Sequence, residues 1–274
     1  MTGLLGPNGA GKTTILHLIV GLLRPSGGSV TVGGTASWQH PEIYRSLGFV
    51  PESEGVYAFL TGYEFVLLNA RLQGVRDPAA AATRAIAQVE LEGAQHRAIS
   101  TYSKGMRQRC KIAAVLVHEP TVLLLDEPFN GMDPKQRVQM MALFRRLADD
   151  GCIVLVSSHI LEEIDRLADT VLVIIGGRLA ASGSSRVIRQ LMTDRPHTFT
   201  VRTSDDRALA AAIVRQGGTQ GIDFVAEGIV VRTADLGAFT RALPVLAREA
   251  NVSILEVHPT DESLESVFSY LVQG

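Results

Sequence analysis

The fold is decided by Gly6-Pro7-Asn8-Gly9-Ala10-Gly11-Lys12-Thr13, which matches the pattern G-x-x-x-x-G-K-[ST] at every fixed position. Glycines reach backbone conformations that other residues avoid, so the main chain can wrap its N–H groups around the phosphates of a nucleotide. We expect Lys12 to reach the β and γ phosphates and the Thr13 hydroxyl to bind Mg²⁺. The stretch therefore predicts a phosphate-binding loop.

The segments on either side of the loop support this interpretation against a chance match. Residues 2–5 form a short apolar strand, and the run 14–23 predicts a helix that ends at Arg24-Pro25-Ser26-Gly27-Gly28. The positive N-terminal end of that helix faces the expected phosphates. The loop thus stands between a strand and a helix, which is the arrangement typical of a phosphate-binding loop.

The composition of the chain limits which partners it can bind and in which cellular compartment it is expected. The chain has 274 residues, with 26 basic and 28 acidic side chains and a formal net charge of −2, so no nucleic-acid partner is expected. Cys110 and Cys152 stand in apolar settings typical of buried, reduced thiols. The longest apolar runs, such as 15–23 and 171–175, are shorter than the ~20 residues that span a bilayer.

A second acidic motif completes the expected nucleotide site. The unbroken apolar run 122–125 predicts a buried parallel strand, and it ends in Asp126-Glu127-Pro128. Asp126 is expected to belong to the Mg²⁺ shell. Glu127 is the candidate general base for a water aligned on the γ-phosphate. The competing interpretation is a solvated acidic loop after a strand.

Three further segments narrow the class of nucleotide-binding protein. They are Tyr102-Ser103-Lys104-Gly105-Met106-Arg107-Gln108-Arg109, Asn130-Gly131-Met132-Asp133 and Ser157-Ser158-His159. In the first, Ser103 predicts the N-cap of a helix and, with Gly105, an anion site, although an ordinary basic helix fits the segment equally well. In the last, His159 follows the apolar strand 153–156, where a histidine alone is more often structural than catalytic.

Taken in order, these segments resemble the nucleotide-binding domain of the ABC ATPase superfamily, over residues 6 to about 186. The resemblance implies an α/β P-loop NTPase fold, with a RecA-like parallel core and a helical subdomain. It also implies that residues 6–14, including Thr14, bind the phosphates, and that Asp126 and Glu127 are the magnesium and catalytic carboxylates. His159 resembles the switch histidine that contacts the γ-phosphate.

The form Y-S-K-G-M-R-Q-R with N-G-M-D-P looks most like the type-2 export branch. That resemblance implies an ATPase, using ATP and Mg²⁺, at the cytoplasmic face of the cell membrane, paired with a separate integral membrane permease. It further implies a homo- or heterodimer of such domains, in which Ser103 and Gly105 contact the nucleotide held by Lys12 of the other copy. The alternatives are a soluble ABC-type ATPase and a catalytically silent nucleotide-binding partner.

The sequence departs from the family pattern near the metal site. The family usually has a glutamine that couples the magnesium site to the permease, and this chain has Glu52 instead. A carboxylate is a good ligand for a hard cation, so we expect Glu52 to contact Mg²⁺ while adding negative charge beside the phosphates. Lys104 and Met106 replace the usual glycine and glutamine of the signature segment.

The remaining sequence predicts a domain plan. Residues 1–186 form the ATP-binding domain with a helical subdomain at about 53–119, and 187–197 form a linker. Residues 198–274 show the order β-α-β-β-α-β of a small ferredoxin-like α+β domain, with a last helix at 263–271. Four apolar residues, Val56, Tyr57, Phe59 and Leu60, are expected either to contact the permease or to pack in the core.

The loop begins unusually early in the chain. Only residues 1–5 precede it, whereas family members have about two more strands there, including an aromatic residue that stacks on adenine. No aromatic residue precedes Lys12. We therefore expect the recorded start to be internal to a longer gene. The alternative is a protein that holds its nucleotide chiefly by the phosphates and Mg²⁺ and lacks the roughly 1–3 kcal/mol of base–aromatic stacking.

Overall fold

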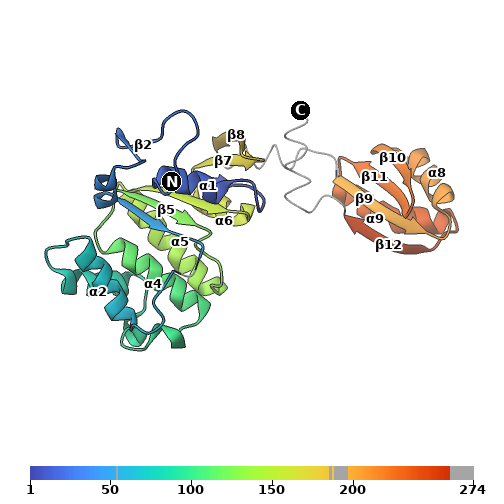
Figure 1. Ribbon diagram of the computed structural model, residues 1–274. Coiled ribbons are helices and arrows are strands. Elements are labelled where there is room, and N and C mark those ends of the chain that lie inside the picture. The colour runs from blue at the N-terminus through green and yellow to red at the C-terminus, as the bar shows by residue number, and fades with distance from the viewer. Residues whose placement is uncertain (54, 185–186, 188–196, 260–274) are drawn as a thin grey trace. The chain divides into compact units, whose positions relative to one another are not determined.

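The chain divides into two compact units, Met1–Ser185 and Arg186–Gly274. A computed structural model describes residues 1–53, 55–184, 187 and 197–259 (Figure 1). Most of the expected linker and the expected last helix at 263–271 lie outside the described residues. The two units are described separately below.

The first unit is built on a six-stranded sheet with the order β4-β5-β6-β1-β7-β8. Its strands are β1 (Thr2–Leu5), β4 (Leu47–Val50), β5 (Val122–Asp126), β6 (Ile153–Ser158), β7 (Thr170–Ile175) and β8 (Arg178–Ser184). The first five pair in parallel, and β8 pairs antiparallel with β7. This is the parallel core that the apolar runs predict.

Both faces of the sheet are covered, which is why its central strands β1, β5, β6 and β7 are largely apolar. Leu16 of α1 (Lys12–Ile19) packs with Leu4 and Leu124 on one face. On the other face Gly3 lies so close to α6 (Leu161–Leu167) that an added Cβ would be 2.4 Å from Ile164 Cγ2. The long helix α5 (Pro134–Asp149) follows β5 and begins at the N-cap Asp133.

Helix α1 is shorter than the apolar run predicts. It ends at Ile19 rather than at Leu23, because the chain turns at Gly21 (φ 71°), where a Cβ would lie 2.1 Å from the Ser37 carbonyl oxygen. Leu22 and Leu23 are exposed instead of continuing the buried stripe. The neighbouring hairpin β2 (Thr31–Val32) and β3 (Thr35–Ala36) precedes the short helix η1 (Pro41–Arg45).

A group of helices lies beside this sheet (Figure 1). It comprises α2 (Gly62–Leu72), α3 (Pro78–Gln88), η2 (Glu92–Ala94), η3 (Ile99–Thr101) and α4 (Lys104–Leu116). Helix α2 begins with a capping box, in which Glu64 N donates to Thr61 Oγ1 and Thr61 N donates to the Glu64 carboxylate. The side chains of Asp77 and Ser103 accept from Ala80 N and Met106 N and so cap α3 and α4, which places these helix starts by local sequence signals.

The second unit has the order β-α-β-β-α-β expected from its sequence. Its elements are β9 (His197–Thr203), α8 (Asp206–Gln216), β10 (Thr219–Val225), β11 (Gly228–Thr233), α9 (Leu236–Glu249) and β12 (Ile254–Pro259). The strands form an antiparallel sheet in the order β10-β11-β9-β12. Phe199 of β9 and Phe239 of α9 lie in its core, with ring centroids 5.2 Å apart.

The buried pair of Phe199 and Phe239 allows a test of which residues stabilise the second unit. Removing the buried ring in Phe239→Ala is expected to destabilise this unit by about 3–5 kcal/mol, because a cavity remains. Hydrogen exchange of peptides from α8 and α9 measures the loss. Val245→Ala, on an exposed position of the same helix, serves as the control and should exchange like the parent; equal protection in both variants would contradict the assignment of the core.

Candidate functional site

The parallel register brings three polar segments to one edge of the sheet. Leu5, the last residue of β1, pairs with Ser158 of β6, and Asp126 of β5 pairs with Ser157. The phosphate-binding loop, the carboxylates and the Ser-Ser-His segment each follow one of these strand ends. Segments separated by more than a hundred residues therefore meet at the carboxyl edge, which is where ligands bind in such sheets.

The phosphate-binding loop has the expected backbone. Gly9 and Gly11 have φ values of 79° and 103°, which favour glycine over other residues. Gly6 is needed for a different reason, since a Cβ there would lie 2.4 Å from the Ile174 carbonyl oxygen. Asn8, Thr13 and Thr14 are exposed, so the loop and the start of α1 are open to a ligand.

Lys12 is buried at the centre of the site. Its ammonium group donates to the carbonyl oxygens of Gly6 at 2.8 Å and Pro7 at 3.2 Å, and lies 3.4 Å from Glu127 Oε1. Carbonyl dipoles compensate only part of a buried positive charge. A phosphate group is the anion that this loop geometry suits best.

Asp126 accepts two strong hydrogen bonds. Thr13 Oγ1 donates to its Oδ2 at 2.7 Å, and Ser157 Oγ donates to its Oδ1 at 2.6 Å. A hydroxyl and a carboxylate of this kind are oxygen ligands suited to Mg²⁺. Sequence reasoning placed Thr13 and Asp126 here but gave Ser157 no role, although a hydroxyl at a strand end beside an acidic residue was its signal.

Glu127 is held in a single orientation by its surroundings. Its side chain is only 7% exposed, its Oε2 lies 2.9 Å from His159 Nδ1, and its backbone N–H donates to Ser157 Oγ at 3.0 Å. Its φ of 46° is unfavourable for a residue with a side chain. Its Oε1 accepts no hydrogen bond from any described residue, although Lys12 Nζ is nearby. Such an oxygen is suited to accept a proton.

Glu52 was expected beside the Mg²⁺ ligands, but its side chain contacts Asn130 instead of Thr13 or Asp126. Its carboxylate accepts a hydrogen bond from Asn130 Nδ2 at 3.3 Å, whereas the Thr13 hydroxyl points to Asp126. Glu52 is exposed and follows β4, the strand next to β5. Asn130, which sequence reasoning left without a partner, thus ties the two loops together.

Ser103 and Gly105 are placed away from Lys12 of their own chain. Met106 N donates to Ser103 Oγ at 3.2 Å, and a Cβ on Gly105 would lie 3.0 Å from the Gly131 carbonyl oxygen. Within the described ranges, both residues have their contacts in α4 and the segment 130–136. Tyr102 precedes them, and burial raises the pKa of its phenol, which donates to the Ala94 carbonyl.

Comparisons with known proteins show which family the chain resembles in sequence. Residues 1–130 match the ABC transporter family. The chain is 32% identical over 277 residues to the bacitracin transport ATP-binding protein BcrA of Enterococcus faecalis, covering 99% of this chain and 87% of that protein. It is 35% identical over 275 residues to the daunorubicin/doxorubicin resistance ATP-binding protein DrrA of Streptomyces peucetius, covering 97% and 82%.

A solved dimeric bacterial ABC transporter cassette has a similar structure. Its TM-score is 0.63 and its sequence identity is 25%, over 68% of this chain and 85% of that one. The shared part corresponds in extent to the first unit rather than to the whole chain.

The serine at the strand end provides a test of the site's internal network. Ser157→Ala removes the donor to Asp126 and leaves the buried Glu127 N–H unpaired, so the free energy of unfolding should fall by about 1–3 kcal/mol. Urea unfolding followed by the fluorescence of Trp38, the single tryptophan, reports on the first unit. Ser100→Ala, at an exposed serine, is the control; equal midpoints for the two variants would contradict the network.

Proposed function

Because the chain belongs to the ABC transporter ATP-binding proteins, we propose that the carboxyl edge of its sheet binds ATP with Mg²⁺ and that Glu127 is the general base for hydrolysis. The chain is an ATPase subunit of an exporter-type ABC transporter. The observation that supports this assignment of residues is the meeting of Lys12, Asp126, Glu127 and His159 at one edge of the sheet.

The residues present fit a nucleotide with its cation. The open loop at residues 6–14 offers backbone N–H groups, and Lys12 offers a buried ammonium group for the phosphates. Thr13 and Asp126, already joined by a hydrogen bond, offer oxygen ligands for Mg²⁺. We place Glu52 next to this pair, on the neighbouring strand end. The cation supplies charge neutralisation for the developing phosphate charge.

Glu127 and His159 have different roles toward the attacking water: Glu127 accepts its proton, and His159 orients Glu127. Glu127 takes its proton at Oε1, because Oε2 is occupied by His159 Nδ1 at 2.9 Å. The contact with His159 fixes the plane of the carboxylate and leaves the other imidazole nitrogen free to face the nucleotide. The Glu127 side chain is only 7% exposed, so the base stays within the site.

A second copy of the domain is part of the proposal. Ser103 and Gly105 have no contact with the loop of their own chain in the described part of the structure, so they are placed to act on the nucleotide of another subunit. The structurally similar cassette is described as dimeric. Two-fold pairing, as a homo- or heterodimer, then completes each site from both chains.

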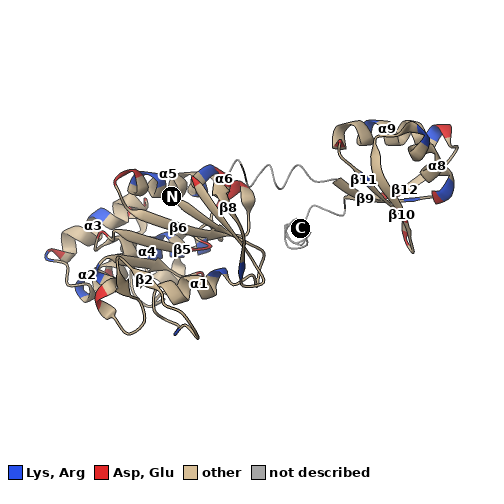
Figure 2. Ribbon diagram, turned by 90° about the horizontal axis from the view of Figure 1, so that it is seen from above, with Lys and Arg blue, Asp and Glu red and all other residues tan. Residues whose placement is uncertain are grey.

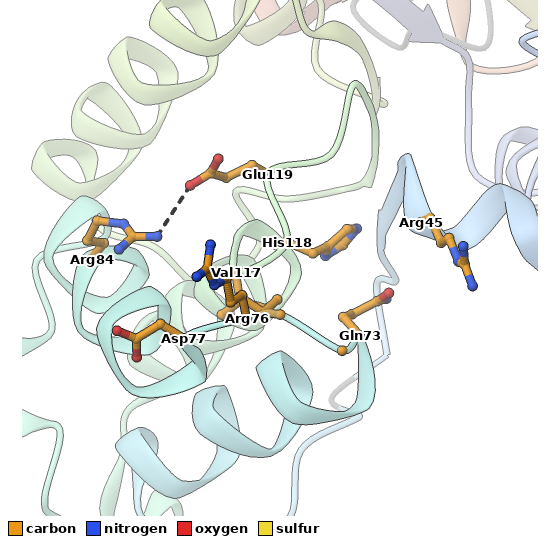
Figure 3. A pocket seen from close by; sticks show the side chains of 10 residues that line it. Arg45, Gln73, Arg76, Asp77, Arg84, Val117, His118 and Glu119 are labelled. Atoms are coloured by element: carbon orange, nitrogen blue, oxygen red, sulfur yellow. Dashed lines mark hydrogen bonds and ion pairs between the residues drawn. The ribbon is translucent and has the colours of Figure 1, made fainter.

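We also place the permease contact beside the helices of the first unit. A cavity of about 920 Å³ lies between η1, the α2–α3 loop and the end of α4. Figure 3 shows the charged side chains that line it, among them Arg45, Arg76, Asp77, Arg84 and Glu119. Arg84 and Glu119 form an ion pair at 3.5 Å, and burial lowers the pKa of His118.

Exposed aromatic side chains support the same docking face. Of the four apolar residues considered from sequence, Tyr57 is 54% and Phe59 is 79% exposed, with their ring centroids 5.9 Å apart. Tyr57 also contacts the buried Phe65 edge-on, so the pair is anchored on α2. Elsewhere acidic and basic side chains are interspersed on the helices of both units (Figure 2). We propose that the aromatic pair and the cavity receive the cytoplasmic loops of the permease.

The catalytic assignment is tested by Glu127→Gln. The amide keeps the size of the side chain but cannot take a proton, so steady-state ATP hydrolysis should fall by at least ~10²-fold while ATP binding remains. Phosphate release and nucleotide binding measure the two properties separately. Glu92→Gln, at an exposed glutamate, should behave as the parent. Phosphate release near the parent rate would remove Glu127 from its role.

The docking proposal is tested by Tyr57→Ala combined with Phe59→Ala. Loss of two aromatic anchors typically weakens an interface by about 2 kcal/mol or more, so recovery of the chain with membranes that contain its permease should fall severalfold. Basal ATP hydrolysis should not change. Ile153→Ala removes a similarly exposed apolar side chain at the opposite end of the sheet and is the control. Equal recovery of all variants would place the permease elsewhere.

A further inference from the structure

One lysine is buried inside the helix that begins at the signature segment. Lys111 lies on α4 between the fully buried side chains of Cys110 and Ile112, and is itself only 5% exposed. A charged ammonium group is rarely buried unless strong partners compensate its lost hydration. Its neighbour Cys110 shows how apolar the surroundings are, because burial raises the pKa of that thiol to about 12.

The partners of Lys111 include backbone carbonyls of the Glu52 loop. Its ammonium group donates to the carbonyl oxygens of Pro51 at 2.7 Å and Ser53 at 2.6 Å, and lies 3.5 Å from that of Glu52. Three successive carbonyls thus converge on one cation. This arrangement fixes the main chain of the loop while the Glu52 side chain remains directed to Asn130.

Helix α4 links the Glu52 loop to Ser103 and Gly105, the two residues proposed to contact the nucleotide of a second subunit. Ser103 caps α4, and Lys111 lies about two turns further along it, a distance of roughly 12 Å at 1.5 Å per residue. An α-helix held by tertiary contacts transmits displacement along its axis as a rigid rod. A movement of Ser103 and Gly105 on a second chain's nucleotide therefore displaces Lys111, and with it the three carbonyls.

We propose that Lys111 is a positioning residue that locks the Glu52 loop to the signature helix, so that Glu52 reaches the cation of its own site only when α4 is correctly placed. This inference rests on the proposed function, because it assumes that Glu52 approaches Mg²⁺. Lys111 itself touches neither nucleotide nor cation. Its effect on hydrolysis passes entirely through the loop at 51–53.

The anchoring itself is tested without any nucleotide. Lys111→Met keeps the length of the side chain but removes the donor, so the loop should open more often. Cleavage by a glutamate-specific protease after Glu52 should then accelerate about tenfold relative to cleavage after Glu92 in the same molecule, if cleavage follows the population of open forms. Lys111→Arg, which retains a donor, should restore most of the protection.

The coupling is tested by the Mg²⁺ concentration that half-saturates ATP hydrolysis. We expect Lys111→Met to raise this concentration about tenfold with a smaller effect on the maximal rate, as for loss of ground-state positioning. Combined with Glu52→Ala, it should have no further effect, because the two changes act on one interaction. Arg146→Met, which removes an exposed cation from α5, is the control and should match the parent.

The possible outcomes separate the two proposals. Unchanged cleavage in folded Lys111→Met overturns the anchor, whatever the role of Glu127. Faster cleavage with an unchanged Mg²⁺ requirement, or additive effects of Lys111→Met and Glu52→Ala, overturns the coupling and leaves only a structural bond. A failure of the proposed function appears instead as undiminished hydrolysis in Glu127→Gln, and the protease measurement still decides the anchor.

Discussion

The parallel register of β1, β5 and β6 is the constraint on which the site depends. Leu5 opposite Ser158 and Asp126 opposite Ser157 set three strand ends level with one another. A slip of one residue would turn each side chain to the other face of the sheet, which would separate Asp126 from the Thr13 hydroxyl. The apolar residues on both faces oppose such a slip, so the core that stabilises the fold also positions the chemistry.

Several charged side chains are buried close together at this edge of the sheet. Lys12, Asp126 and Glu127 are all buried, and each is compensated by hydrogen bonds or by an opposite charge within a few ångströms. Desolvation of such groups is expensive, so their network gives little net stability. Its value lies in orientation, because removing one member leaves another charge without compensation. The unfavourable backbone at Glu127 fits this view, since the surrounding contacts maintain a conformation that an isolated chain avoids.

Local signals explain what the sequence analysis predicted well. The glycines of the loop and the cap at Ser103 depend on residues within a few positions of one another. The end of α1 was predicted wrongly, because the close approach of Ser37 to Gly21 is a tertiary contact. Ser157, Asn130 and Lys111 were missed for the same reason. Their partners are 30 to 78 residues away in the chain, and only the folded sheet and helices bring them together.

The replacement of the usual glutamine by Glu52 changes the electrostatics of the proposed site more than its shape. A carboxylate repels phosphates unless a divalent cation lies between them, whereas an amide does not. The position of this loop would therefore respond to charge if its own side chain were the only restraint. Lys111 adds a second restraint, because it donates to the main-chain carbonyls of Pro51 and Ser53, which do not titrate. These bonds to the main chain leave the Glu52 side chain out of the anchor, so its carboxylate, which accepts a hydrogen bond from Asn130, is the group that a nearby cation would attract.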